Sequence, residues 1–115
     1  MLSPQANRWQ MALQNSVQAD GLLVDSVEGG QCCLGVGLLA NGVDREDLVE
    51  HGMPEQTDLD KDTISRALPV PAALFGPLAM LNDGGMPHRI IGELLIDFWL
   101  TGDDSEIRRL SGQFL

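Results

Sequence analysis

Apolar residues recur at helical spacing in the first part of the chain, with polar residues between them. The residues that would share one face of a helix are Ala6, Trp9, Leu13 and Val17. Ser3 followed by Pro4 is typical of a helix start, because serine can cap the first N–H groups and proline has no N–H to satisfy. The pattern predicts an amphipathic helix from residue 4 to about residue 18.

Two short runs that favour β-structure follow, separated by the Gly29-Gly30 pair. Residues 22–27 form the first run and residues 31–34 the second, and a glycine pair between such runs favours a tight turn. We therefore expect a small antiparallel β-hairpin at about residues 22–34. Because an isolated two-stranded ribbon is only marginally stable in water, helices should cover one of its faces.

The remaining chain predicts further helices, so the expected fold class is α+β: mainly helical, compact, and a single domain over residues 1–115. We expect a short buried helix from near Cys33 to Ala40, another from Asp44 to about Glu50, a polar loop over residues 53–63, a helical turn over 64–68 and a kinked helix over 72–82.

The clearest helix should run from Pro87 to about Leu100, and a last turn or two should follow Asp104. The apolar side chains of its predicted core face are Ile90, Ile91, Leu94, Leu95 and Phe98. The charged side chains of the opposite face are Arg89, Glu93 and Asp97.

The length and composition fit one domain with its own core. A chain of 115 residues with 43% apolar side chains is long enough to bury a core without disulfides. The chain begins without a basic, apolar leader, and no run approaches the roughly 18 apolar residues of a spanning helix. We therefore expect a cytoplasmic protein with no membrane contact, whose two cysteines are free thiols.

The net charge is strongly negative. Seventeen Asp and Glu residues against seven Lys and Arg residues give −10 at pH 7, which repels nucleic-acid phosphates and attracts basic surfaces. Residues 44–62, which we name the acidic segment, hold eight acids against only Arg45 and Lys61. We predict no nucleic-acid partner, and a protein partner with a basic surface that contacts Asp44, Glu46, Asp47, Glu50, Glu55, Asp58, Asp60 and Asp62. The same charges also favour solubility.

Cys32 and Cys33 precede a small apolar run, where a helix should begin. A thiol at a helix N-terminus can be activated as a nucleophile, and Cys33 with His51 or His88 as its base would form a cysteine-dependent enzyme. The alternative is that both thiols pack in the core, as free cysteines commonly do. We favour packing, because neither histidine lies in an informative local pattern.

The acidic segment also contains a partial metal-binding pattern. Asp58, Asp60 and Asp62 copy the first three ligand positions of a calcium loop, but the required glycine and glutamate are replaced by Thr63 and Pro69. The adjacent cysteines also lack the C-x-x-C unit of structural zinc sites. The sequence therefore predicts no metal ion and no other cofactor.

Residues 78–100 have the outline of a helix-turn-helix. In such a motif the second helix enters the major groove and needs polar or basic residues on its outer face. The residues expected on that face are His88, Arg89, Glu93 and Asp97, which are neutral or acidic overall. We therefore favour a helical hairpin in the core over a DNA-reading motif.

Three stretches carry a resemblance: RWQMAL at residues 8–13, CCLGV at residues 32–36 and LNDGGMPHRIIGELLIDFW at residues 81–99. Together they resemble a family of small phage and prophage proteins of unknown function. Its members carry a W-x-x-AL helix, a CCLGV-like motif and a late LND-x-G segment before an amphipathic helix. In this chain Gly37-Leu38-Leu39 replaces the cysteine and aspartate that complete the second motif. The resemblance implies a phage origin and no particular reaction.

The sequence thus predicts a small acidic phage-encoded accessory protein that binds a host or phage protein without catalysis, in the host cytoplasm. The first alternative is a small cysteine-dependent enzyme that uses Cys33 with His51 or His88. The second alternative is a helix-turn-helix regulator. The sequence makes no prediction of the oligomeric state.

Overall fold

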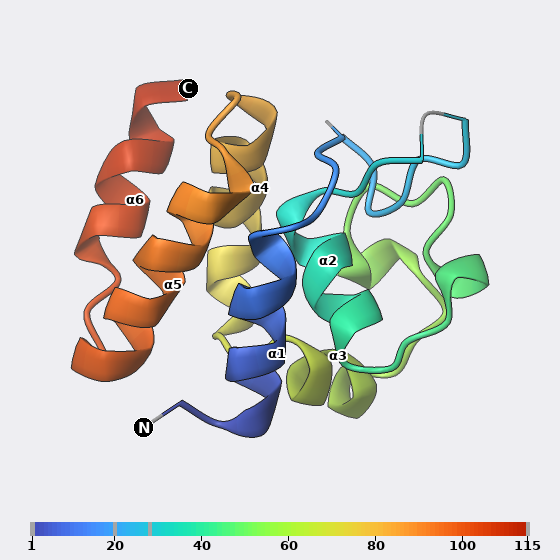
Figure 1. Cartoon of the computed structure of the whole chain (residues 1–115), viewed down its shortest axis with the longest axis horizontal. Coiled ribbons are helices and arrows are strands. Elements are labelled where there is room, and N and C mark those ends of the chain that lie inside the picture. The colour runs from blue at the N-terminus through green and yellow to red at the C-terminus, as the bar shows by residue number, and fades with distance from the viewer. Residues whose placement is uncertain (1, 20, 28, 115) are drawn as a thin grey trace.

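The computed structural model of the protein describes residues 2–19, 21–27 and 29–114. Over these ranges the chain is mostly helical (Figure 1). Its α-helices are α1 Pro4–Leu13, α2 Cys33–Ala40, α3 Lys61–Ala67, α4 Phe75–Asp83, α5 His88–Thr101 and α6 Ser105–Ser111. Single 3₁₀ turns lie at Arg45–Asp47, Pro54–Gln56, Ala72–Leu74 and Gly112–Phe114.

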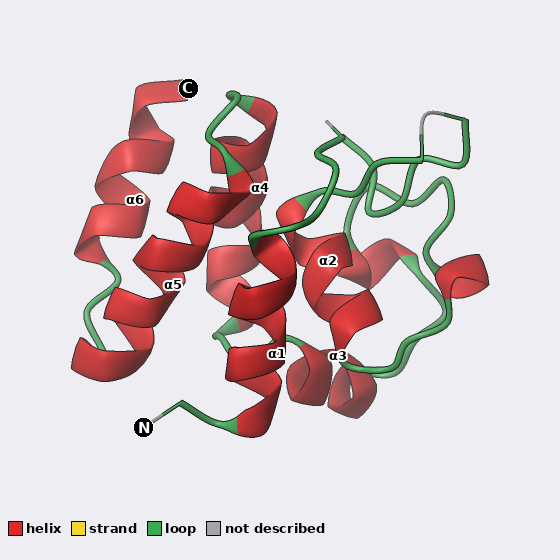
Figure 2. Cartoon of the chain, viewed as in Figure 1, coloured by secondary structure: helices red, strands yellow, loops and turns green. Residues whose placement is uncertain are grey.

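The predicted β-hairpin at residues 22–34 is not formed, and the α+β class is wrong. Figure 2 shows no strand in the described residues. The isolated bridges join Gln18 to Gln31, Val24 to Gln31 and Val24 to Val49. The N–H of Ala19 donates to the carbonyl of Gln31, whereas the N–H of Leu23 donates to the carbonyl of His51. Because these segments divide their hydrogen bonds among several neighbours, no ladder of successive pairs develops.

Helix α1 begins as predicted and ends more than a turn early. The Oγ of Ser3 accepts the N–H of Ala6 at 3.1 Å, and the helix ends at Leu13 instead of near residue 18. Beyond the helix, the side chains of Ser16 and Gln18 reach residues of α4, of α5 and of the loop between them. Val17, which was predicted on the apolar face, is exposed. Tertiary hydrogen bonds have therefore replaced the last helical turn.

The middle of the chain differs from the prediction at two places. The helix expected from Asp44 to Glu50 is only the 3₁₀ turn Arg45–Asp47, and Asp44 makes no side-chain cap. The loop expected over residues 53–63 instead contains a 3₁₀ turn and the start of α3. Asp60 begins that helix, because its Oδ1 accepts the N–H of Thr63 at 2.7 Å.

The later helices follow the predictions closely. Helix α4 continues directly from the turn Ala72–Leu74 and has Pro77 in its first turn. Proline is tolerated there because it has no N–H, and N–H groups of the first turn have no partner within the helix. Helix α5 then spans His88–Thr101. It ends at Gly102, whose φ of 74° is the left-handed conformation that terminates many helices.

The helices pack around a core to which α2 is central. Helix α1 contacts both α2 and α5, and α4 contacts α2, α5 and α6 (Figure 1). Trp9 of α1 is fully buried, and its indole N–H donates to the carbonyl of Cys33 at 2.9 Å. Glycine permits two close approaches to α2: a Cβ on Gly35 would lie 1.9 Å from the carbonyl oxygen of Leu23, and a Cβ on Gly37 would lie 2.7 Å from the Trp9 indole. The acidic segment runs along the opposite edge of the molecule from α6 (Figure 1).

Candidate functional site

Cys32 and Cys33 are buried free thiols. Cys33 occupies the first position of α2, where its side chain is 0% exposed and its Sγ donates to the carbonyl of Leu78 at 3.5 Å. Burial raises the pKa of Cys32 to about 11 and the pKa of Cys33 well above its ordinary value. The loss of hydration on burial therefore raises the thiol pKa by more than the N–H groups at the start of α2 lower it. The prediction that both cysteines pack in the core is confirmed.

His88 is buried as well, which corrects its predicted position on the outer face of the late helix. Its side chain lies at the first position of α5 and is 4% exposed. Its Nε2 lies 2.8 Å from the Oδ1 of Asn82, and its Nδ1 lies 2.5 Å from the Oγ of Ser16. Because an amide oxygen only accepts, Nε2 carries the proton and Nδ1 accepts the serine hydroxyl. Burial lowers the pKa of His88 to about 4, so the ring is neutral at pH 7.

Asn82 connects these buried groups. Its Oδ1 accepts the backbone N–H of Cys33 at 3.0 Å, and its Nδ2 donates to the carbonyl of Ala19 at 2.8 Å. The side chain of Gln18 donates to the backbone carbonyls of Asn82 and Met86. Among the described residues, no buried side-chain nitrogen or oxygen lacks a hydrogen-bond partner. The cluster is thus a satisfied structural network.

The structure does not bring Cys33, His51 and His88 together as a nucleophile and its base. The thiol of Cys33 is bonded to Leu78, and both nitrogens of His88 are bonded to other residues. His51 is half-buried in the acidic segment, where its carbonyl accepts the N–H of Leu23. The described residues therefore lack the thiol–imidazole hydrogen bond that typically activates a cysteine nucleophile.

The side chains predicted to contact a partner are all exposed. They are Asp44, Glu46, Asp47, Glu50, Glu55, Asp58, Asp60 and Asp62. Two have an additional local role. Asp60 caps α3, and the N–H of Thr63 lowers the pKa of its carboxyl group. Glu50 has the left-handed φ of 67° and accepts the hydroxyl of Ser26 at 2.5 Å.

The backbone that carries these acids is fixed to the core. Leu48, Pro54 and Thr57 are buried between the exposed carboxylates. The side-chain oxygen of Gln56 accepts the N–H groups of Gly52 and Met53 at 2.9 and 3.2 Å. The acidic segment is thus an ordered surface with buried anchors.

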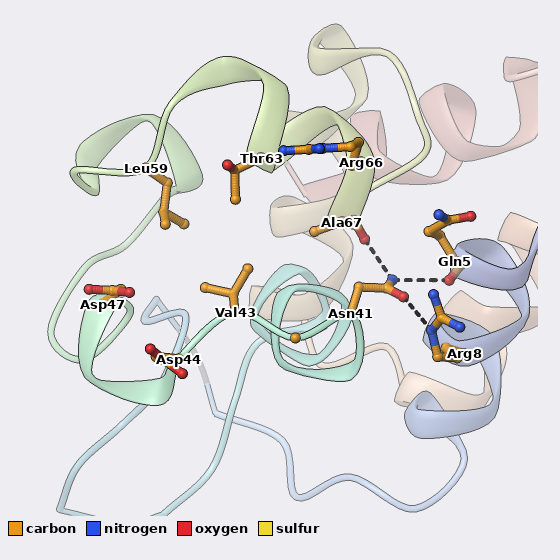
Figure 3. A pocket seen from close by; sticks show the side chains of 11 residues that line it. Gln5, Arg8, Asn41, Val43, Asp44, Asp47, Leu59, Thr63, Arg66 and Ala67 are labelled. Carbon is orange, nitrogen blue, oxygen red and sulfur yellow. Dashed lines mark hydrogen bonds between the residues drawn. The ribbon is translucent and has the colours of Figure 1, made fainter.

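A polar pocket of about 400 Å³ lies beside this segment, where its start at Asp44 and Asp47 approaches Leu59 near its end (Figure 3). We define it by six of its lining residues: Arg8, Asn41, Val43, Asp44, Asp47 and Arg66. Asn41, which follows α2, connects the surrounding helices. Its Oδ1 accepts the Nε–H of Arg8 at 2.8 Å, and its Nδ2 donates to the carbonyls of Gln5 and Ala67 at 3.1 and 2.9 Å.

Figure 3 shows how charge is distributed in the polar pocket. Asp44 and Asp47 lie at one end and Arg8 at the other, with Val43 between them and Arg66 on the edge formed by α3. The sequence pattern indicates the two aspartates as contact residues but neither arginine. The two arginines lie on helices far apart in the chain, and no local pattern relates them.

Comparisons with known proteins identify no relative, since no protein-family model, no curated protein and no solved structure matches the chain. Within the described ranges, no three side chains of His, Cys, Asp or Glu are grouped so that they could hold a metal ion. In the same ranges, every individual helix falls short of the length and apolar composition that a bilayer span requires. Only Lys61–Ala67 and Ala72–Asp83 taken together, across a bend of 69°, reach that length and composition.

Proposed function

We propose that this protein is a small phage-encoded accessory protein of the host cytoplasm that acts by binding a basic protein without catalysis. The observation that carries the proposal is the contrast between its two groups of candidate residues. All eight carboxylates of the acidic segment are exposed, whereas Cys33 and His88 are buried and hydrogen-bonded to other groups. The resemblance of the CCLGV and LNDGG stretches to phage proteins supports the origin.

The anchoring of the acidic segment supports a binding role beyond solubility. A charged tail that serves solubility needs no fixed conformation. Here the buried side chains of Leu48, Pro54 and Thr57 hold the acids on an ordered backbone. Preorganisation lowers the conformational entropy lost on association, and clustered like charges accelerate encounter with an oppositely charged surface.

The proposal is tested by affinity capture from a bacterial lysate with three forms of the protein as bait. The first is the wild type, and the second is the double variant Asp58→Asn/Asp62→Asn. The third is the control Glu93→Gln/Asp97→Asn, which removes two exposed acids from α5. Both variants change the net charge by the same amount, from −10 to −8. They therefore separate the position of the charge from its total.

We expect a basic protein to be retained by the wild type and by the α5 control, and to be depleted with the Asp58→Asn/Asp62→Asn bait. Retention should also decrease in high salt, because exposed charges are screened. Equal retention of every captured protein by the two double variants would contradict the proposal. The acids of the segment would then serve solubility.

A further inference from the structure

The polar pocket is lined by two guanidinium groups that form no direct ion pair in the part of the chain that the structure describes, although the charge of Arg66 acts on the carboxylate of Asp60. The Nε of Arg8 donates to Asn41, and the Nε of Arg66 donates to the backbone carbonyl of Asp62 at 3.3 Å. Within the described residues, the terminal nitrogens of both side chains make no hydrogen bond, and neither arginine forms an ion pair. The terminal N–H groups of both exposed side chains are therefore left to solvent or to a ligand.

Three other arginines of the chain are arranged differently. Arg89, Arg108 and Arg109 each pair with a carboxylate of their own helix or its cap, at 3.9, 2.9 and 2.6 Å. The chain has seventeen acids to neutralise seven basic residues. Arg45, outside the pocket, likewise forms no ion pair among the described residues. What favours an anion at the pocket is that two arginines without an ion pair line the same cavity.

The opposite end of the polar pocket attracts a cation. Asp44 and Asp47 are exposed there and belong to the acidic segment, so the negative surface continues outward from the pocket. Val43 lies between the two charged ends (Figure 3). A volume of about 400 Å³ falls within the range of small-ligand sites and accommodates a few amino-acid residues. The complementary ligand is therefore anionic at one end and cationic at the other.

We propose that the polar pocket binds the carboxyl terminus of a basic partner chain. The terminal carboxylate would contact Arg8 and Arg66, because a guanidinium presents parallel N–H groups that match a carboxylate. A lysine or arginine close to that terminus would contact Asp44 and Asp47, and further basic residues would follow the acidic segment. The inference rests on the proposed function, because it concerns the same basic partner: the partner's carboxyl terminus would occupy the polar pocket, and the rest of its contact would lie along the acidic segment.

The test measures the binding of short fluorescent peptides to the full chain by anisotropy. The first peptide ends in lysine with a free carboxylate, the second is its carboxyl-terminal amide, and the third has glutamine in place of the lysine. Amidation and the glutamine change should each weaken binding by about tenfold or more, because hydrogen bonds to charged groups are among the strong ones. Free lysine should bind more weakly than the peptide.

Variants of the pocket assign each effect to its residues. Arg8→Gln and Arg66→Gln should weaken binding of the free acid until it equals that of the amide. Asp44→Asn/Asp47→Asn should remove the preference for lysine over glutamine. Arg89→Gln, which removes an exposed arginine of α5, should leave both preferences unchanged.

Three results would overturn the inference: no binding of the free acid, equal binding of acid and amide, or free lysine binding as tightly as the peptide. The last result would identify a pocket for free amino acids. The proposed function is judged separately, by whether Asp58→Asn/Asp62→Asn releases a captured basic protein. If the peptide fails while that release occurs, only the assignment of the pocket is wrong.

Discussion

The side-chain amide of Asn82 caps the helix that begins at Cys33. Its Oδ1 accepts the N–H of Cys33 at 3.0 Å, across a separation of 49 residues. Cys32 stands at the N-cap position of α2 and makes no side-chain cap. A residue of α4 therefore supplies the acceptor that a serine or aspartate would normally provide. The same oxygen also accepts the Nε2–H of His88, so one buried amide joins α2, α4 and α5.

Asn82→Ala should destabilise the protein by roughly 2–5 kcal/mol, because it leaves the N–H of Cys33, the ring N–H of His88 and the carbonyl of Ala19 without partners. Urea unfolding measures the free-energy difference. The control Asn15→Ala removes an exposed amide and should change stability by less than about 0.5 kcal/mol. Similar effects of the two variants would show that the Asn82 network contributes little to stability.

Stability should depend on pH through His88. The folded-state pKa of about 4 lies below the ordinary value of 6.5, so the unfolded chain binds the proton more readily between those values. The stabilisation is fully present above pH 6.5 and decreases as the pH falls towards 4, by about 3 kcal/mol in total. The difference in unfolding free energy between wild type and His88→Gln, measured across this range, isolates the contribution. His51→Gln serves as the control, and the same pH dependence in the wild type and His88→Gln would disprove this assignment.

The two thiols should be nearly unreactive while the protein is folded. Cys32 and Cys33 are buried and their pKa values are raised, so little thiolate forms and reagent reaches it only through opening of the structure. Native labelling with a thiol reagent at pH 7 should be slower than labelling in urea by roughly a hundredfold or more. Fast labelling of the folded protein would restore the cysteine-dependent enzyme as a candidate.

Two glycine substitutions should have opposite effects on stability. Gly35→Ala places a Cβ 1.9 Å from the backbone of Leu23, which must move, so we expect a loss of roughly 3 kcal/mol or more. Gly76→Ala meets nothing within 4 Å in the first turn of α4 and should raise stability by up to about 1 kcal/mol. Thermal and urea unfolding of both variants test the close approach of the Leu23 backbone to Gly35. An unchanged stability of Gly35→Ala would show that the Leu23 backbone does not contact α2 this closely.

Several of these features could be predicted from the sequence because they depend on neighbouring residues. The Ser3 cap and the helix that begins at Cys33 are local patterns, and the structure confirms them. The predicted core face of the late helix is confirmed for Ile91, Leu94, Leu95 and Phe98, whereas Ile90 is only half-buried and lies outside the core cluster. The prediction of a hairpin was wrong because the backbone of Gln31 pairs with both Gln18 and Val24. No local pattern in the sequence indicates this division of hydrogen bonds.

The candidate sites show the same limit. The exposure of the acids follows from their cost of burial, so it could be predicted from composition alone. The buried position of His88 could not, because it depends on Ser16 and Asn82, which lie in other parts of the chain. The polar pocket could not be predicted either. The hydrogen bond from Arg8 to Asn41, and the position of Arg66 in the same lining, depend on how distant parts of the chain pack together.

The most direct test of the acidic segment as a contact surface is the association rate constant of a captured basic partner, measured by stopped flow at increasing ionic strength. The Debye length falls from about 10 Å at 0.1 M salt to about 3 Å at 1 M. We expect the rate constant to decrease steeply with salt for the wild type and for Glu93→Gln/Asp97→Asn. For Asp58→Asn/Asp62→Asn we expect a lower rate constant and a weaker dependence on salt. If the two double variants instead give the same rate and the same salt dependence, total charge governs the encounter and the acidic segment is not the contact surface.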